Sequence, residues 1–507
     1  MNLKIGIDNC KPGWKIILKQ IGVSFSKCSL LSNILPEEYS AIIITETHNT
    51  KENEVIDDYA SSGGAVLYSD NTTLESVSYK IKNVSTLYSQ ENTPFAQIGL
   101  ADIFSTIKIP ISKELHLIDV GLKITSSNIR NSLILPFNVN DLILSFNSRR
   151  KKFYANRKEL PSEIVSEVSK GKLRKIVEIA LEYLHHKRDL PFVHLWHQPY
   201  VDKNLFIFRL DTDFCSKQDA NEMYDICKKN NISTTWFLDT DSKDRIVNYA
   251  SMENQEMAIH CDNHFIYDTF EENYDNIKNA DKKLKKSGIK ANGFAAPFGD
   301  WNSSLDEALQ KMELKYSSEF ALDYDDLPFY PYHENNFSNI LQIPIHPISL
   351  GRLRRSHFTE EEMLQYYIDI IEEKIRSEEP VLIYHHPHHK HLAVFEKVIQ
   401  YINSNNYGNM NMLEFCDWWR NKYELNPVFE YENNIISAKY SSDEVFIRVS
   451  TRKCYAILQK GEYQISESGL ELHPKIKFKN DVKRIRKFHW RDILYNYESK
   501  RSKKAFK

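Results

Sequence analysis

A chain of 507 residues is too long for one ordinary hydrophobic core, so we expect two or three domains. Its formal net charge of only −3 argues against a general nucleic-acid binder. Apolar residues make up 41% and charged residues 27%, the proportions of a globular protein, and no apolar run approaches the length of a membrane span.

The cysteines indicate a reducing compartment. There are seven, an odd number, and they are scattered without a CxxC pair. The first eight residues are typical of a short strand rather than a signal peptide. We therefore expect a cytoplasmic protein.

Residues 1–145 alternate short apolar strands with helical patterns, which predicts an open parallel sheet covered by helices. The clearest strands are expected at 3–7, 40–45 and 65–68, with a helix over 52–60. This layout resembles the flavodoxin-type, glutamine-amidotransferase-like domains. Neither a nucleophile elbow nor a glycine-rich phosphate loop follows these strands, so we interpret the domain as noncatalytic.

Residues 146–203 are predicted to form a basic, helical bridge. The run Arg149-Arg150-Lys151-Lys152 opens it, and we interpret this run as a solvated charged face. Leucine and isoleucine recur at helical spacing over 162–186.

The apolar run 205–210 predicts a buried strand that ends in Asp211-Thr212-Asp213. Arg209, Asp211 and Asp213 point to the same side of it at a period of two. Two buried carboxylates are costly unless a cation or a proton occupies the site. His260 and His264 are four residues apart, a spacing that lets both imidazoles reach one ion from a helical turn. One carboxylate and two histidines leave positions on a divalent metal open to water and substrate.

These segments, with two later ones, resemble the four motifs of the NodB-type polysaccharide deacetylases of carbohydrate esterase family 4. The second motif, H-[ST]-x-x-H, is present at 260–264 with Cys261 at the hydroxyl position. The third, R-x-P-x-G, stands at 295–299 with Ala295 in place of the arginine. The last is an apolar strand at 381–387 that ends in His385-His386-Pro387.

The resemblance implies a distorted (β/α) barrel over residues 204–425. Helices are expected between its strands, over 217–230, 271–287, 304–312 and 359–377.

The resemblance also implies roles for particular residues. Asp213, His260 and His264 would bind the metal, with zinc the best fit and cobalt or nickel also suitable. Asp211 would be the catalytic base, and the backbone N–H of Phe298 would bind the oxyanion. A histidine of the last strand would protonate the leaving nitrogen, and we prefer His386 to its neighbour.

Four further residues are assigned to substrate binding: Arg209, Trp301, His346 and His385. Trp301 suits stacking on a sugar ring, and His346 follows a strand. Arg209 could in addition replace the missing motif-three arginine beside Asp211.

Residues 426–507 change to a period of two, which predicts a small β-sandwich-like domain. From 475 to 507 there are 13 Lys or Arg against 3 Asp or Glu, with aromatic residues interleaved. This basic segment is either a solvated tail or a contact for an anionic membrane surface; nucleic acid is the weaker alternative.

The sequence thus predicts a metal-dependent hydrolase that removes an acyl group from an N-acylated sugar or glycan in surface-glycan biosynthesis. One alternative is another carbon–nitrogen hydrolase on the same barrel, either a deformylase or a cyclic amidase. The other is a catalytically silent glycan-binding or assembly protein, which Ala295 favours.

Overall fold

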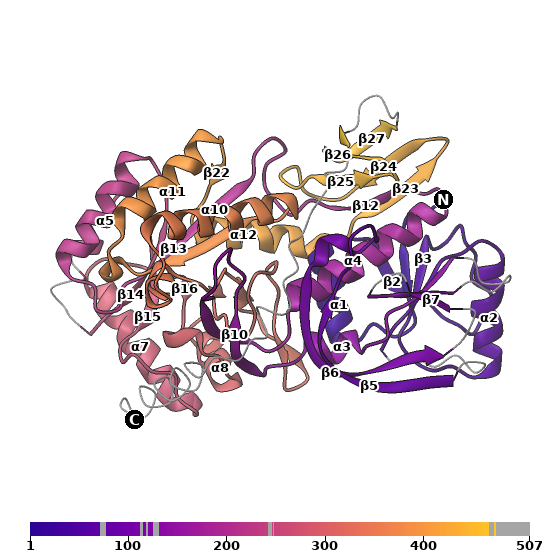
Figure 1. Cartoon of the computed structure of the whole chain (residues 1–507), viewed down its shortest axis with the longest axis horizontal. Coiled ribbons are helices and arrows are strands. Elements are labelled where there is room, and N and C mark those ends of the chain that lie inside the picture. Colours follow the sequence, from indigo (N-terminus) through magenta and orange to yellow (C-terminus); the bar gives the residue numbers. More distant parts are fainter. Residues whose placement is uncertain are drawn as a thin grey trace. The chain divides into compact units, whose positions relative to one another are not determined.

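The computed structural model describes residues 1–70, 78–111, 115–117, 120–124, 131–241, 246, 248–465 and 471–472. Its contacts divide the chain into two compact units, whose elements are labelled in Figure 1. Unit 1 takes Met1–Ser145, Val168–Val201 and the described part of Arg420–Asn480, and unit 2 takes Phe146–Glu167 and Asp202–Trp419. Each unit is therefore assembled from separate segments, whereas the sequence predicted consecutive domains.

The centre of unit 2 is a parallel sheet in the order β20-β17-β16-β15-β14-β13-β21, with β22 beside β13. Its strands are β13 (Leu205–Asp211), β14 (Thr235–Asp239), β15 (Glu256–Cys261), β16 (Gly293–Phe294), β17 (Tyr316–Ser317), β20 (Leu341–Gln342), β21 (Val381–His385) and β22 (Gly408–Asn409). The backbone N–H of His346, just after β20, donates to the carbonyl of Leu382 in β21 at 2.9 Å. The predicted α/β fold is confirmed as a curled parallel sheet.

Local sequence explains these elements. Every residue of β13 is buried, as in a parallel strand covered on both faces. The helices that follow the strands are α5 (Lys217–Lys229), α7 (Phe270–Lys286), α8 (Ser303–Lys311), α9 (Leu350–Arg355), α10 (Glu360–Arg376), α11 (Leu392–Ser404) and α12 (Met412–Glu424). Ser216 with Asp219, and Thr359 with Glu362, form capping boxes that start α5 and α10. The four helices expected from the sequence are confirmed to within one residue at each end.

An antiparallel hairpin precedes the sheet in the chain and belongs to the same unit. It consists of β10 (Ser148–Lys152) and β11 (Ser162–Ser166), and the N–H of Ser166 donates to the carbonyl of Phe320 at 2.9 Å. The helix expected over 162–186 was wrong in its first part, since α4 begins only at Lys170 (Lys170–Lys187). The solvated face expected at 149–152 was also wrong in part. Lys151 is buried, and its Nζ donates to the Tyr324 hydroxyl at 3.0 Å.

Unit 1 contains a sheet in the order β2-β1-β3-β4-β9-β8-β7, parallel from β2 to β9 and antiparallel beyond. Its strands are β1 (Ile5–Ile7), β2 (Phe25–Lys27), β3 (Ala41–Ile44), β4 (Val66–Tyr68), β7 (Leu115–Leu117), β8 (Leu122–Ile124) and β9 (Ser132–Ile134). Helices α1 (Pro12–Ile21), α2 (Thr50–Ser61) and α3 (Val139–Ile143) lie between its strands or follow them in the chain, with a long hairpin of β5 (Ser78–Tyr88) and β6 (Leu100–Ile111). The likeness to amidotransferase-like domains stays a prediction.

Two antiparallel sheets complete unit 1. One has the order β12-β25-β26-β28, with β12 (Phe192–Leu195), β25 (Ile447–Ser450), β26 (Cys454–Leu458) and β28 (Glu471–Leu472). The other has the order β23-β24-β27, with β23 (Val428–Glu432), β24 (Ile435–Lys439) and β27 (Gly461–Gln464). Their description as a sandwich stays a prediction, and the basic segment 475–507 lies outside the described residues. Within those residues, no helix has the length and apolarity needed to cross a membrane.

Candidate metal and catalytic site

Three predicted metal ligands meet at the carboxyl ends of β13 and β15. Nε2 of His260 lies 2.7 Å from Oδ1 of Asp213, and Nε2 of His264 lies 2.9 Å from Oδ2 of the same carboxylate. One ligand atom from each residue lies within 4.8 Å of the other two. The fold therefore brings together Asp213, His260 and His264, the three residues that the sequence predicted to share one metal ion.

The helical turn expected around the two histidines was wrong. His260 lies within β15, which ends at Cys261, and His264 follows on a loop. The side-chain oxygen of Asn276 on α7 fixes this loop by accepting the backbone N–H groups of Asp262 and Asn263 at 3.0 and 2.7 Å. The two imidazoles are therefore positioned by the end of a strand and by a hydrogen-bonded loop, and not by a helical turn.

The orientation of His260 suits a metal ligand. Its Nδ1 lies 2.6 Å from the carbonyl of Ala295, so Nδ1–H donates there, and in the neutral imidazole the lone pair of Nε2 faces Asp213. Nε2 of His260 and Oδ1 of Asp213 are buried, and among the described residues neither atom has a hydrogen-bond partner besides the other. Two such atoms only 2.7 Å apart are arranged to face a common cation.

The electrostatics of the site also call for positive charge. Burial by itself would raise the pKa of Asp213, but the neighbouring histidines, His260 foremost, hold it well below its usual range. Burial would lower the pKa of His260, but the charge of Asp213 raises it to about 9. Without a metal, a proton on His260 supplies the positive charge; a divalent cation would supply it instead. One carboxylate and two imidazoles are a donor set that zinc, cobalt or nickel accepts.

Arg209 binds Asp211 from the same strand. Its Nε and Nη2 each lie 2.7 Å from one oxygen of the Asp211 carboxylate. Its Nη1 donates to the carbonyl and the hydroxyl of Ser318 at 2.5 and 3.1 Å. The guanidinium lies 5.0 Å from the ring centre of Phe237 and is 1% exposed. A fully paired, bidentate arginine therefore holds Asp211 in one orientation.

His386 completes the group around Asp211 and Asp213. Its Nε2 lies 3.7 Å from Oδ2 of Asp213 and 4.0 Å from Oδ2 of Asp211. Burial lowers the pKa of His386 to about 4, against the opposing effect of the two carboxylates. Between the two histidines left open by the sequence, the structure places His386 at the site.

Phe298 sits in a strained turn beside these residues. It has φ of +60° within the 3-10 turn η2 (Pro297–Gly299), and its ring lies 4.9 Å from that of His264. A Cβ at Gly299, which has φ of +63°, would lie 2.4 Å from the Phe320 ring, so the turn requires glycine there. Phe298 lines the pocket described below; the oxyanion role of its backbone N–H stays a prediction.

Glu319 fixes the start of this turn. It is fully buried and accepts the backbone N–H of Ala296 at 3.3 Å. Burial raises the pKa of Glu319 to about 7. The sequence reasoning did not single out this residue, because a glutamate after a short strand carries no signal of burial.

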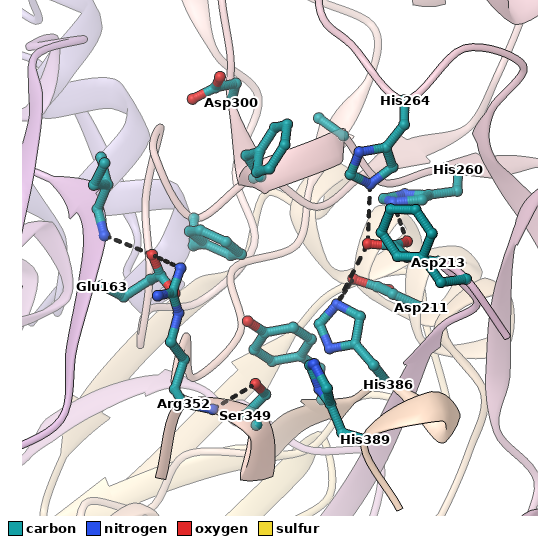
Figure 2. Close-up of a pocket in the computed structure, with 18 of the residues that line it drawn as sticks. Glu163, Asp211, Asp213, His260, His264, Asp300, Ser349, Arg352, His386 and His389 are labelled. Carbon is teal, nitrogen blue, oxygen red and sulfur yellow. Dashed lines mark hydrogen bonds and ion pairs between the residues drawn. The ribbon is translucent and has the colours of Figure 1, made fainter. Parts of the chain in front are cut away.

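The site opens into a cavity of about 470 Å³. Its lining includes Asp211, Asp213, His260, His264, Phe298 and His386 from the predicted set. Figure 2 shows most of the lining side chains pointing into this space.

None of the four residues predicted to bind substrate lines this cavity. Arg209 lies beneath Asp211 with its donors occupied, as described above. Alternation along the chain at the end of β21 turns the His385 side chain to the side opposite His386. Its Nε2 lies 2.9 Å from the carbonyl of Lys390. Nδ1 of His346 lies 3.0 Å from Asp325, and its Nε2 lies 3.0 Å from the Tyr366 hydroxyl.

Trp301, the fourth residue predicted to bind substrate, also lies outside the cavity lining. Its ring packs 4.6 Å from that of Phe146 and 5.8 Å from that of His333. Trp301 follows the third motif closely in the sequence, but its side chain packs against other aromatic rings and does not point into the cavity.

Other lining residues were missed by the sequence reasoning. They come from the hairpin, from α9 and its approach, and from the 3-10 turn η3 (Pro387–His389), and include Arg150, Glu163, Ser349, Arg352, Arg355, His388 and His389. The only available signals were the basic run at 149–152 and the histidine-rich run after β21, and both patterns are more often exposed.

Comparison with known proteins agrees with this geometry. The sequence model of the family "Polysaccharide deacetylase" matches residues 210–317, so the chain carries a polysaccharide deacetylase (NodB) domain there. That segment holds Asp211, Asp213, His260 and His264. No curated protein matches the chain.

Several solved structures are similar to this chain. One, assigned as a polysaccharide deacetylase, from Mycobacterium smegmatis, is 13% identical and covers 45% of this chain and 94% of its own, with a TM-score of 0.39. A family 4 carbohydrate esterase pseudoenzyme from Bacillus anthracis is 14% identical over 43% of this chain and 67% of its own (TM-score 0.32). A family 4 acetyl xylan esterase from Clostridium thermocellum, in complex with cobalt, is 13% identical over 42% and 91% (TM-score 0.31).

Proposed function

We propose that this deacetylase domain is a metal-dependent hydrolase that removes the acyl group from an N-acylated sugar. One observation carries the proposal: the ligand atoms of Asp213, His260 and His264 converge within 4.8 Å on the wall of a cavity that Asp211 and His386 also line. A cavity of about 470 Å³ lies within the range of small-molecule sites, and the charged side chains and aromatic rings that line it suit a sugar.

Each residue then has a definite task. A divalent cation held by Asp213, His260 and His264 would supply Lewis-acid chemistry toward the acyl carbonyl and favour ionisation of water. Asp211, fixed by Arg209, accepts a proton from the attacking water. His386 donates a proton to the leaving nitrogen; an imidazole whose pKa burial lowers is a strong acid once it is protonated. The backbone N–H of Phe298 would stabilise the oxyanion.

The first test is the metal content of the purified protein beside an Asp213→Ala, His260→Ala double variant. We expect one tightly held ion per chain in the wild type and its loss in the double variant. Asp262→Asn is a matched control, because this carboxylate lies between the two histidines but binds Lys283 and, at 2.8 Å, Thr240. Absence of bound metal in the wild type, even after reconstitution with zinc or cobalt, would contradict the proposal.

If metal is bound, N-acyl sugars are screened for released acid. Release of acetate supports a deacetylase, and release of formate alone would point instead to the deformylase alternative. We propose zinc as the metal, surface-glycan biosynthesis as the process and the cytoplasm as the location; these rest on the sequence reasoning alone.

A silent glycan-binding protein is the second candidate, and Ala295 is the observation that favours it. The arginine of the third motif is absent, and the carbonyl of Ala295 orients His260. Arg209 weakens this candidate because it already makes a bidentate contact with Asp211. Tight sugar binding without any hydrolysis by the metal-loaded protein would support the silent reading.

A further inference from the structure

Phe214 is an exposed aromatic residue on the wall of the same cavity. It follows the candidate metal ligand Asp213 directly, and it is 65% exposed. The centre of its ring lies 5.9 Å from that of His264 and 6.0 Å from that of His388, and both histidines line the cavity as well. A single exposed apolar residue is ordinary on a protein surface. Phe214 differs because it stands where the cavity beside the metal ligands meets the solvent.

The backbone at Phe214 does not favour a phenylalanine. The N–H of Cys215 donates to the carbonyl of Thr212 at 3.0 Å and closes a turn with Asp213 and Phe214 at its centre. Phe214 has φ of +53°, in the left-handed region, where the second central residue of a turn is usually glycine or asparagine. A bulky side chain is strained in this conformation, and such strain is typical of functional sites. Neither the turn nor burial in the core accounts for a phenylalanine at this position, which leaves a contact in the cavity to explain it.

The turn that carries the ring is held on both sides. The backbone N–H and the hydroxyl of Thr212 lie 3.0 and 3.1 Å from the carbonyl of Phe237 on β14 and donate to it. The same hydroxyl accepts the N–H of Asp239 at 3.0 Å. On the other side of the turn, Cys215 is fully buried. The backbone of Phe214 is therefore fixed before a ligand arrives, and a contact made by a preorganised residue loses less entropy on binding.

An exposed phenyl ring at the opening of a cavity suits the apolar face of a sugar. The C–H groups of a pyranose ring form such a face, and packing it on an aromatic ring removes both surfaces from water. The hydroxyl groups at the edge of the sugar need polar partners, and the lining contains polar side chains such as Asp300 and Ser349. The sequence assigned sugar stacking to Trp301, whose ring packs against Phe146 and His333 instead.

We propose that Phe214 is the stacking platform for the pyranose ring that carries the scissile N-acyl group. Because Phe214 directly follows Asp213 and its ring lies beside that of His264, a sugar on this platform has its acyl group within reach of the metal site. The inference rests on the proposed function and adds to it a residue that determines specificity. It also explains why a strained, exposed phenylalanine stands at this turn.

The test measures kcat/KM for N-acetylglucosamine, N-acetylgalactosamine and N-acetylmannosamine with the metal-loaded wild type and three variants. We expect Phe214→Ala and Phe214→Leu to lower kcat/KM for the preferred sugar by about tenfold, mainly through KM, because leucine keeps an apolar surface but not a flat ring. Phe214→Trp should stay within about threefold of the wild type. Phe104→Ala is the matched control: this phenylalanine of unit 1 is also exposed and has φ of +41°, but it does not line the cavity. Metal content should be unchanged in every variant.

A Phe214→Leu variant as active as the wild type would overturn the inference. Loss of metal from Phe214→Ala would also overturn it, because the residue would then support Asp213 instead. So would a defect that grows when the acetyl group is replaced by butyryl, since the ring would then contact the acyl chain. If no sugar is hydrolysed, calorimetric binding of the three sugars decides. Binding that weakens in Phe214→Ala but not in Phe104→Ala would support the inference while the proposed function fails, and failure of all three sugars to bind would overturn the inference by itself.

Discussion

At Asp211, the neighbour two residues back on the same strand supplies the cation that the third motif would supply from position 295. Alternation along β13 makes this possible, because Arg209 and Asp211 project to one side of the strand. The guanidinium is also bound to Ser318, so it cannot turn toward a substrate. Arg209 is therefore a positioning residue for Asp211, the proposed base, rather than a substrate ligand.

Replacing Arg209 with Ala leaves a buried carboxylate without its ion partner, which disfavours its charged form. Because only the charged form accepts a proton, we expect kcat to fall by about 100-fold or more and the acidic limb of the pH–rate profile to move to higher pH. Arg209→Lys, which keeps the charge but not the two parallel bonds, should recover part of kcat and return the limb toward its original position. A profile that Arg209→Ala leaves unchanged would rule out this role.

Among the elements, the turn η2 depends on a buried acid from the loop after β17. Glu319 accepts the N–H of Ala296, the residue that leads into Pro297–Gly299. Burial raises its pKa to about 7 from an ordinary value of 4.5. Between those two values the folded protein holds a proton that the unfolded chain has released.

The free energy of unfolding should therefore decrease as the pH rises from about 4.5 to about 7, by about 3 kcal/mol from this group alone. Glu319→Gln mimics the protonated acid and removes this dependence. We expect the melting temperature of the variant, relative to wild type, to be higher at pH 8 than at pH 5. An equal difference at both pH values would show that Glu319 does not titrate in this way.

The same elements show what sequence could and could not predict. Asp211, Asp213, His260 and His264 were found because each stands at or just after an apolar strand, and parallel strands bring their carboxyl ends to one edge. Trp301 and His346 were misplaced because loop side chains lack that periodicity. Arg150 and Glu163 could not be found, since their hairpin lies far before β13 in the chain and only tertiary packing brings it to the cavity.

At the scale of the whole molecule, unit 1 is closed by the last described part of the chain. β12 pairs with β25, the N–H of Leu3 donates to the carbonyl of Phe429 at 2.8 Å, and that of Tyr431 donates to Met1 at 2.9 Å. Ile447 and Val449 of β25 are fully buried. Without the segment after Arg420, residues 1–201 would therefore lack the strand that pairs with β12 and part of the core of unit 1.

A fragment of residues 1–201 should consequently melt at a lower temperature than unit 1 in the whole protein, or aggregate, because it exposes an apolar strand edge. Melting followed by circular dichroism checks this. Addition of a second fragment, 420–480, should restore solubility and raise the melting temperature. A fragment 1–201 that is monomeric and as stable as the whole chain would contradict this account.

The order in which the segments occur has a consequence for synthesis on the ribosome. The described segments of unit 2 have all been made before the strands that close unit 1, so β12 is made long before its partner β25. Between Leu195, the end of β12, and Ile447, the start of its partner β25, lie 251 residues of chain. At about 5–20 residues per second, β12 waits roughly 13–50 s for its partner, long enough for a nascent chain to need a chaperone over that edge.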